Sequence, residues 1–145
     1  MYGYRPYVRE EHVIHIGQRD QQQTRDYGSP DILGTGIHCI SLDTIRSVSI
    51  EEIISRIREK MRAMDAATFW IHFDTDVMDD KINPAVDYRL PDGLSTGELQ
   101  QLLTAVISPG KVIGMSVSIY NPTLDRDRSV AATIVSLLAT VLKGC

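Results

Sequence analysis

Apolar and polar residues follow one another along this chain with the periods of strands and helices. Residues 12–17 form a short β-rich run closed by Gly17, which predicts a buried strand. Residues 69–73 form a nearly continuous apolar run, which predicts a strand covered on both faces, as in parallel sheets. A further strand is predicted over residues 112–120. The polar residues 18–27 fit either a helix or a loop.

Helical periodicity is clearest in the middle of the chain. Ser49 followed by Glu52 is a capping-box pattern, and isoleucine and methionine then recur at three- and four-residue steps up to Met64. A second such pattern, Ser95 with Glu98, predicts a helix through residue 107. A last helix is predicted over residues 129–143.

Strands that alternate with helices predict an α/β fold in three layers, α/β/α, with a mostly parallel sheet. The chain has no internal repeat and no linker-like stretch, so we expect residues 1–145 to form a single domain. Ligands of such folds bind at the carboxyl ends of the strands. The segments of interest are therefore 17–20, 74–79 and 120–125, where the acidic residues gather.

Composition narrows the classes of protein. The 145 residues include 15 basic and 19 acidic side chains, a net charge of −4, and 43% are hydrophobic. A folded domain fits these values, and nucleic acid is not an expected partner because binding it needs a basic face. No apolar run reaches the ~18 residues of a membrane span, and the N-terminal residues lack the apolar core of a secretory signal. With Cys39 and Cys145 expected as free thiols, a cytoplasmic location is predicted.

Asp74 and Asp76 come directly after the apolar run 69–73. At a buried strand end, unpaired carboxylates are costly, and a bend just past the strand would bring both around one hard divalent cation. One alternative is that the two aspartates are structural, with one capping a turn and the other forming an ion pair with a basic residue. Another is a phosphatase resembling the haloacid dehalogenase superfamily, with Asp74 as the nucleophile and Asp76 as the acid/base.

A larger set of motifs includes this pair. The motifs are, in chain order, Ile-His-Ile-Gly-Gln-Arg at 14–19, His-Phe-Asp-Thr-Asp-Val-Met-Asp at 72–79, Asn-Pro-Ala-Val at 83–86, Leu-Pro-Asp-Gly-Leu-Ser at 90–95, Val-Ile-Gly-Met-Ser-Val at 112–117 and Asn-Pro-Thr-Leu-Asp at 121–125. Together they resemble the arginase/agmatinase/formiminoglutamase family, the ureohydrolases. The resemblance runs from about residue 12 to residue 142, in the right order.

The resemblance implies an arginase-like fold and a binuclear Mn²⁺ centre that hydrolyses a non-peptide C–N bond of a guanidino or amidine-type small molecule. It makes Asp74 and Asp76 metal ligands and places Asp79 where the family has an aspartate beside the site, although Asp80 replaces the proline that usually follows. Arg19, in a Gly-x-Arg sequence at a strand end, is a weaker candidate for contact with an anion or a site aspartate.

Two departures from the family pattern limit what the resemblance implies. The Gly-Gly-Asp-His and Asp-Ala-His-x-Asp motifs, which carry other metal ligands, do not occur in these residues, so the chain corresponds to the C-terminal half of the family domain. Catalysis by this chain alone is not expected, and a non-catalytic metal-binding or interaction half-domain is the alternative. Ile119 stands where members that act on guanidinium substrates carry a glutamate, which puts arginine in doubt as the substrate.

A half-domain would expose a sheet edge and part of an apolar face, so we expect a homo-oligomer or a complementary chain.

His12, His15 and His72 are interpreted as structural. His72 in particular is left out of the metal ligands because strand alternation points it away from the neighbour of Asp74. Asp125 and Asp127 are expected to cap the last helix.

Overall fold

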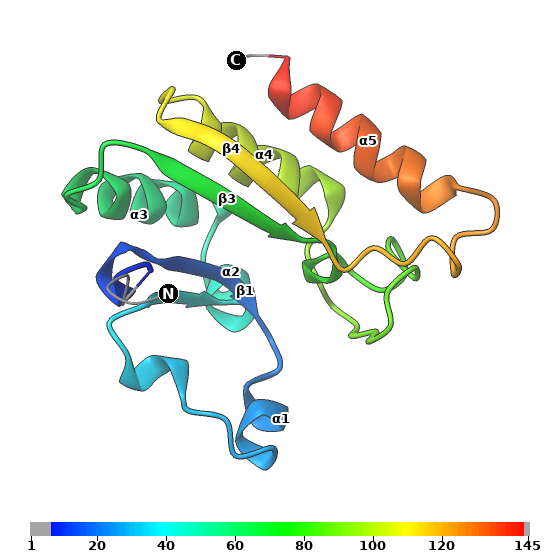
Figure 1. Ribbon diagram of the computed structural model, residues 1–145, viewed down its shortest axis with the longest axis horizontal. Helices are drawn as coiled ribbons and strands as arrows, with labels where there is room; N and C mark the ends of the chain where they lie inside the picture. Colours follow the sequence, from blue (N-terminus) through cyan, green and yellow to red (C-terminus); the bar gives the residue numbers. More distant parts are fainter. Residues whose placement is uncertain (1–6, 144–145) are drawn as a thin grey trace. The chain divides into compact units, whose positions relative to one another are not determined.

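The computed structural model describes residues 7–143, and the chain forms two compact units, Met1–Ala66 and Ala67–Cys145. In the first unit β1 (Ile14–Gln18) pairs in parallel with β2 (His38–Ser41), and the register shifts between Ile16 and Gln18 (Figure 1). The other elements of this unit are η1 (Glu10–His12), α1 (Gln21–Asp26), η2 (Ile32–Gly34), α2 (Leu42–Ser47) and α3 (Ile50–Ala63). The prediction of one domain stays a prediction.

The helix α3 forms as its sequence pattern predicts. The hydroxyl of Ser49 accepts the N–H of Glu52 at 3.2 Å, which satisfies one of the donors left open at a helix N-terminus. The apolar stripe is buried through Ile53, Ile57 and Met61. By contrast, the sequence pattern does not predict β2 and α2. A four-residue strand that leads straight into a six-residue helix has too few residues to show the hydrophobic period of either element.

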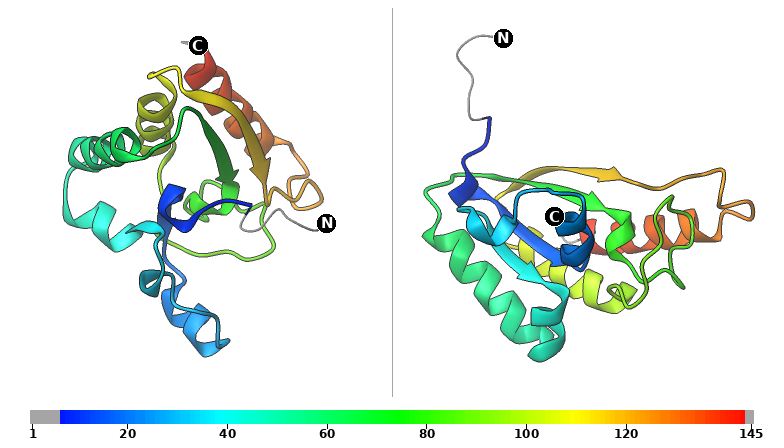
Figure 2. Two further views of the ribbon diagram at one scale, coloured as in Figure 1. Left: turned by 60° about the vertical axis from the view of Figure 1, so that its left-hand side comes forward. Right: turned by 90° about the horizontal axis from the view of Figure 1, so that it is seen from below.

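The second unit is built on β3 (Phe69–Asp74) and β4 (Val112–Ser118), which pair in parallel. The helices α4 (Thr96–Ile107) and α5 (Ser129–Leu142) contact each other and lie on the same side of this strand pair (Figure 2). The predicted capping box of α4 is complete, since Ser95 and Glu98 satisfy each other's backbone N–H groups. Parallel strands alternating with helices confirm the α/β class.

The prediction that the strand at 69–73 is covered on both faces is wrong. Phe73 is 4% exposed, whereas Trp70 is 62% exposed and His72 is also exposed. Successive strand residues point to opposite faces, and α4 and α5 lie on one side of the pair only. The other face of β3 and β4 therefore carries side chains in contact with water.

Two smaller predictions concern the cysteines and the membrane. Cys39 is a free thiol, and burial raises its pKa above the ordinary value, with Asp31 adding to the shift. Cys145 and the first six residues lie outside the described part of the chain. Within residues 7–143, no helix has the length and apolarity that crossing a membrane requires.

Candidate metal centre

The two aspartates lie where β3 ends. Asp74 is the last residue of the strand, and Asp76 is the middle residue of η3 (Thr75–Val77), the single 3₁₀ turn that follows directly. The bend predicted just past the strand is thus present. The side chain of Asp74 is 46% exposed, so its carboxylate has access to solvent and to a dissolved ion.

Thr75, between the two aspartates, is fully buried and holds the turn in place. Its hydroxyl donates to the carbonyl of Ser118 at 2.9 Å, and its own carbonyl accepts the side-chain amide of Asn83 at 2.9 Å. The amide oxygen of Asn83 in turn accepts the N–H of Ala85 at 3.2 Å. The turn that carries both carboxylates is therefore tied to the end of β4 and to the loop that follows.

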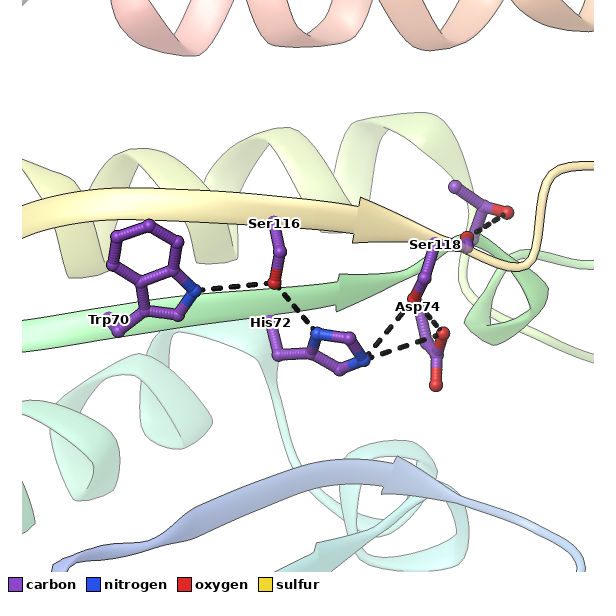
Figure 3. A network of polar contacts seen from close by, with 6 residues as sticks. Trp70, His72, Asp74, Ser116 and Ser118 are labelled. Atoms are coloured by element: carbon purple, nitrogen blue, oxygen red, sulfur yellow. Dashed lines mark hydrogen bonds and ion pairs between the residues drawn. The ribbon is translucent and has the colours of Figure 1, made fainter. Parts of the chain in front are cut away.

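The carboxylate of Asp74 is oriented from the neighbouring strand (Figure 3). The hydroxyl of Ser118 donates a short hydrogen bond to Oδ1 of Asp74, and Nε2 of His72 lies 3.7 Å from the same oxygen. Among the residues that the structure describes, no recorded hydrogen bond or ion pair reaches Oδ2. One carboxylate oxygen is thus held by the protein and the other is open to a ligand.

Asp79 organises the loop between η3 and α4. Its Oδ1 accepts the N–H of Lys81 at 3.0 Å, and its own N–H donates to the carbonyl of Leu94 at 3.1 Å. The backbone N–H of Lys81, helped by those of Asp92 and Gly93, lowers the pKa of Asp79. The carboxylate is therefore occupied by backbone groups, and a role for it beside a metal or a substrate stays a prediction.

Asn121 joins the loop to the end of β4, and Asp80 is bonded within the loop. Asn121 donates its backbone N–H to the carbonyl of Ala85 at 2.8 Å and its amide to the carboxylate of Asp87 at 2.7 Å. Asp80, which replaces the family's proline, accepts a hydrogen bond from the guanidinium of Arg89 at 3.2 Å. The Asn-Pro motifs that are distant in the sequence are thus in contact in this unit.

Ile119, which follows β4, has a left-handed backbone with φ +69°, and its residue is 47% exposed. A β-branched side chain is disfavoured in this region because its Cβ crowds the following carbonyl. Such a conformation persists only where the surroundings impose it, and it is found most often at functional sites. The strain lies one residue beyond Ser118, the partner of Asp74.

Asp125 caps α5, as predicted. Its carboxylate accepts the N–H groups of Val130 and Ala131 and the hydroxyl of Tyr120, at 3.2, 2.8 and 2.8 Å. Burial alone raises the pKa of Asp125, but the hydrogen bonds from Ala131, Tyr120 and Val130 outweigh it and the pKa lies below its ordinary value. Asp127 accepts the N–H of Ser129 at 3.1 Å and completes the cap.

Arg19 lies in the first unit, directly after β1, whereas the three aspartates of the candidate site belong to the second unit. It is only partly exposed. Its contact with an anion or with a site aspartate stays a prediction.

The donor set fits part of a manganese centre. Carboxylate oxygens suit hard divalent ions, and Oδ2 of Asp74 is open. However, within residues 7–143 no group of three or more His, Cys, Asp or Glu side chains is placed to hold a metal ion. Asp74 and Asp76 can therefore supply only some of the ligands of a binuclear centre. Its two metal ions would need further ligands from residues other than these.

The predicted site does not include the side chains that surround Asp74, and the sequence pattern predicts only a structural role for His72. His72 lies on the same face of β3 as Asp74, two residues earlier, and Ser116 and Ser118 lie opposite them on β4. The spacing of two residues was a usable signal for His72, because residues i and i+2 of a strand share a face. The serines needed the pairing register, which the sequence does not contain.

Comparison with known proteins agrees with the motifs. The family model described as "Arginase family" matches residues 3–143. The arginase of Brucella melitensis biotype 1 is 28% identical over 93 residues, which are 64% of this chain and 30% of that protein. This match and the family model support the arginase-family resemblance over the phosphatase alternative.

Solved structures show the same fold. Arginase from Bacillus subtilis superposes with a TM-score of 0.82 and 23% identity, over 97% of this chain and 48% of that one. Formimidoylglutamase from Bacillus subtilis gives 0.79 and 24%, over 96% and 43%. These likenesses confirm the predicted arginase-like α/β/α fold, and the chain spans less than half the length of each of these relatives. The chain belongs to the arginase family.

Proposed function

We propose that this chain supplies the carboxylate part of the metal centre of a ureohydrolase, an enzyme that hydrolyses a non-peptide C–N bond of a guanidino or amidine-type small molecule. The observation that carries the proposal is the position of Asp74 and Asp76 at the carboxyl end of a parallel strand, with Oδ1 of Asp74 held by Ser118. Open α/β sheets bind their ligands at this end.

Manganese is the proposed metal, and Asp74 and Asp76 are its proposed ligands. Bound there, it would supply a nucleophilic hydroxide at neutral pH. The chain's own part is to hold the carboxylates: Thr75 and Asn83 fix the turn, and Ser118 orients Asp74. The remaining ligands would come from polypeptide outside these residues, either in the same protein or in a complementary chain.

Residue 119 cannot form an ion pair with a positively charged group of the substrate. Ile119 has no charge to pair with a guanidinium, and it follows Ser118 directly in the chain with a left-handed backbone. We therefore propose that the substrate is not arginine held by an ion pair between its guanidinium and residue 119.

A second candidate is metal binding without catalysis. Its support is that residues 7–143 contain no group of three or more potential ligands. The two candidates share the metal site and differ in whether the chain needs its missing ligands to act.

The site is tested by titrating Mn²⁺ into the wild type and into Asp74→Asn and Asp76→Asn, followed by the loss of the free-ion electron paramagnetic resonance signal. Each substitution is expected to weaken Mn²⁺ binding ten-fold or more, because it removes a charged oxygen ligand. Asp65→Asn makes the same chemical change at an exposed position on the approach to β3 and is expected to bind like the wild type.

Circular dichroism of each variant checks that the fold is retained. Equal Mn²⁺ binding by all four proteins would contradict the proposed site. In the same titration, L-arginine is expected to leave the Mn²⁺ affinity unchanged, and a clear shift would contradict the role given to Ile119.

A further inference from the structure

The exposed face of β3 and β4 carries a continuous chain of hydrogen bonds that ends on Asp74 (Figure 3). The parallel register places Trp70 opposite Gly114, His72 opposite Ser116 and Asp74 opposite Ser118. Each side chain bonds the next across the two strands. The chain runs Trp70, Ser116, His72, Ser118, Asp74, with heavy-atom distances of 3.2, 2.8 and 3.2 Å before the short final bond.

The two residues at the ends of this chain, Trp70 and Asp74, limit which atom can donate in each hydrogen bond. The indole N–H of Trp70 can only donate and the carboxylate of Asp74 can only accept. Ser116 accepts a hydrogen bond from Trp70, and it donates its own hydroxyl to Nδ1 of His72 when the imidazole is neutral with its proton on Nε2. Ser118 uses its proton on Asp74, so it can only accept from Nε2 of His72. A neutral imidazole with its proton on Nε2 is the arrangement in which every donor has an acceptor.

Glycine at position 114 allows the first link of this chain. An ideal Cβ built there would lie 2.2 Å from Cζ3 of Trp70, far inside van der Waals contact. The indole therefore lies directly over the backbone of β4, from where its N–H reaches Ser116. Any larger residue at 114 would push the indole away.

We propose that His72 is a positioning residue for Asp74. This inference rests on the function proposed above: His72 holds the hydroxyl of Ser118 so that it donates to Oδ1 of Asp74, which would leave Oδ2 available to a metal ion. The side chains of His72 and Asp74 are 61% and 46% exposed, so these bonds compete with water and add little to folding stability. Substitution of a residue that hydrogen-bonds a metal ligand without contacting the metal typically weakens metal affinity 10–100-fold.

The first test uses the metal-free protein. Long-range ¹H–¹⁵N correlation spectra of the imidazole, recorded where His72 is neutral, are expected to show the proton on Nε2. In Ser116→Ala this preference is expected to weaken, because Nδ1 loses its donor. A proton on Nδ1 in the wild type overturns the inference whether or not a metal binds.

The second test is Mn²⁺ titration. His72→Ala and Ser118→Ala are expected to bind Mn²⁺ about ten-fold more weakly. Ser118→Thr keeps the hydroxyl and His72→Gln keeps an N–H donor, so both are expected to recover most of the affinity. Ser136→Ala, an exposed serine on α5, is the matched control and is expected to bind like the wild type.

The two proposals fail in different ways. If Asp74→Asn and Asp76→Asn bind Mn²⁺ like the wild type, the proposed function fails. If those two variants lose binding while His72→Ala and Ser118→Ala retain it, the metal site stands and the positioning role is overturned. Failure of Ser118→Thr to recover what Ser118→Ala loses also overturns it, because the hydroxyl would then not be the group that matters.

Discussion

Asn83 is a buried side chain that holds the turn carrying Asp74 and Asp76. Its residue is 1% exposed, and its amide bonds two backbone groups, the carbonyl of Thr75 and the N–H of Ala85. Thr75 and Ala85 are themselves 0% exposed. Asn83→Ala would remove both bonds at once and leave no solvent to replace them.

The expected cost follows from what each backbone group retains. The N–H of Ala85 loses its recorded acceptor, which costs about 1–3 kcal/mol for a buried donor. The carbonyl of Thr75 keeps a 3.3 Å bond from the N–H of Met78, so its loss is nearer to that of one ordinary hydrogen bond, about 1 kcal/mol. Asn83→Ala is therefore expected to lower the free energy of unfolding by about 2–4 kcal/mol.

Urea unfolding followed by far-ultraviolet circular dichroism measures this loss. With a slope of about 2 kcal/mol per molar urea, the middle of the usual range, the midpoint is expected to fall by about 1–2 M. Gln101→Ala removes an exposed amide from α4 and is expected to change stability by less than about 0.5 kcal/mol. A loss for Asn83→Ala as small as that of the control would show that the two buried hydrogen bonds of Asn83 do not stabilise the fold. Faster hydrogen exchange at Ala85 is the local signature expected.

Two further predictions concern Asp79 and Ile119. Backbone N–H groups, that of Lys81 first, lower the pKa of Asp79 in the folded chain. The ionised carboxylate of Asp79 therefore stabilises the fold above the unfolded pKa of about 3.9, and this stabilisation is lost as the pH falls through the lower pKa of the folded state. Acid unfolding of Asp79→Asn is expected to lack this part of the pH dependence, and a curve parallel to that of the wild type would argue against it. At position 119, where φ is +69°, Ile119→Gly is expected to be about 1 kcal/mol more stable than Ile119→Ala in thermal unfolding, because only glycine adopts this backbone without strain. Equal melting temperatures would show that the backbone there is not constrained.

The predictions that succeeded rest on local chemistry. The caps of α3 and α4 are formed by Ser49 and Ser95, each bonded to a residue three positions away, and the apolar stripe of α3 is a repeat within one helix. Asp125 and Asp127 likewise cap a helix a few residues later. Interactions of this range are written in consecutive residues, so a single sequence reveals them.

The candidate site divides along the same line. The order of residues along the chain is enough to show that two carboxylates follow an apolar run and that the motifs are those of the arginase family. The pairing of β3 with β4, in the register that sets Ser118 against Asp74 and Ser116 against His72, is visible in the three-dimensional fold alone. A shift of one residue in that pairing would turn both serines to the opposite face, and nothing in either strand's own sequence states the register.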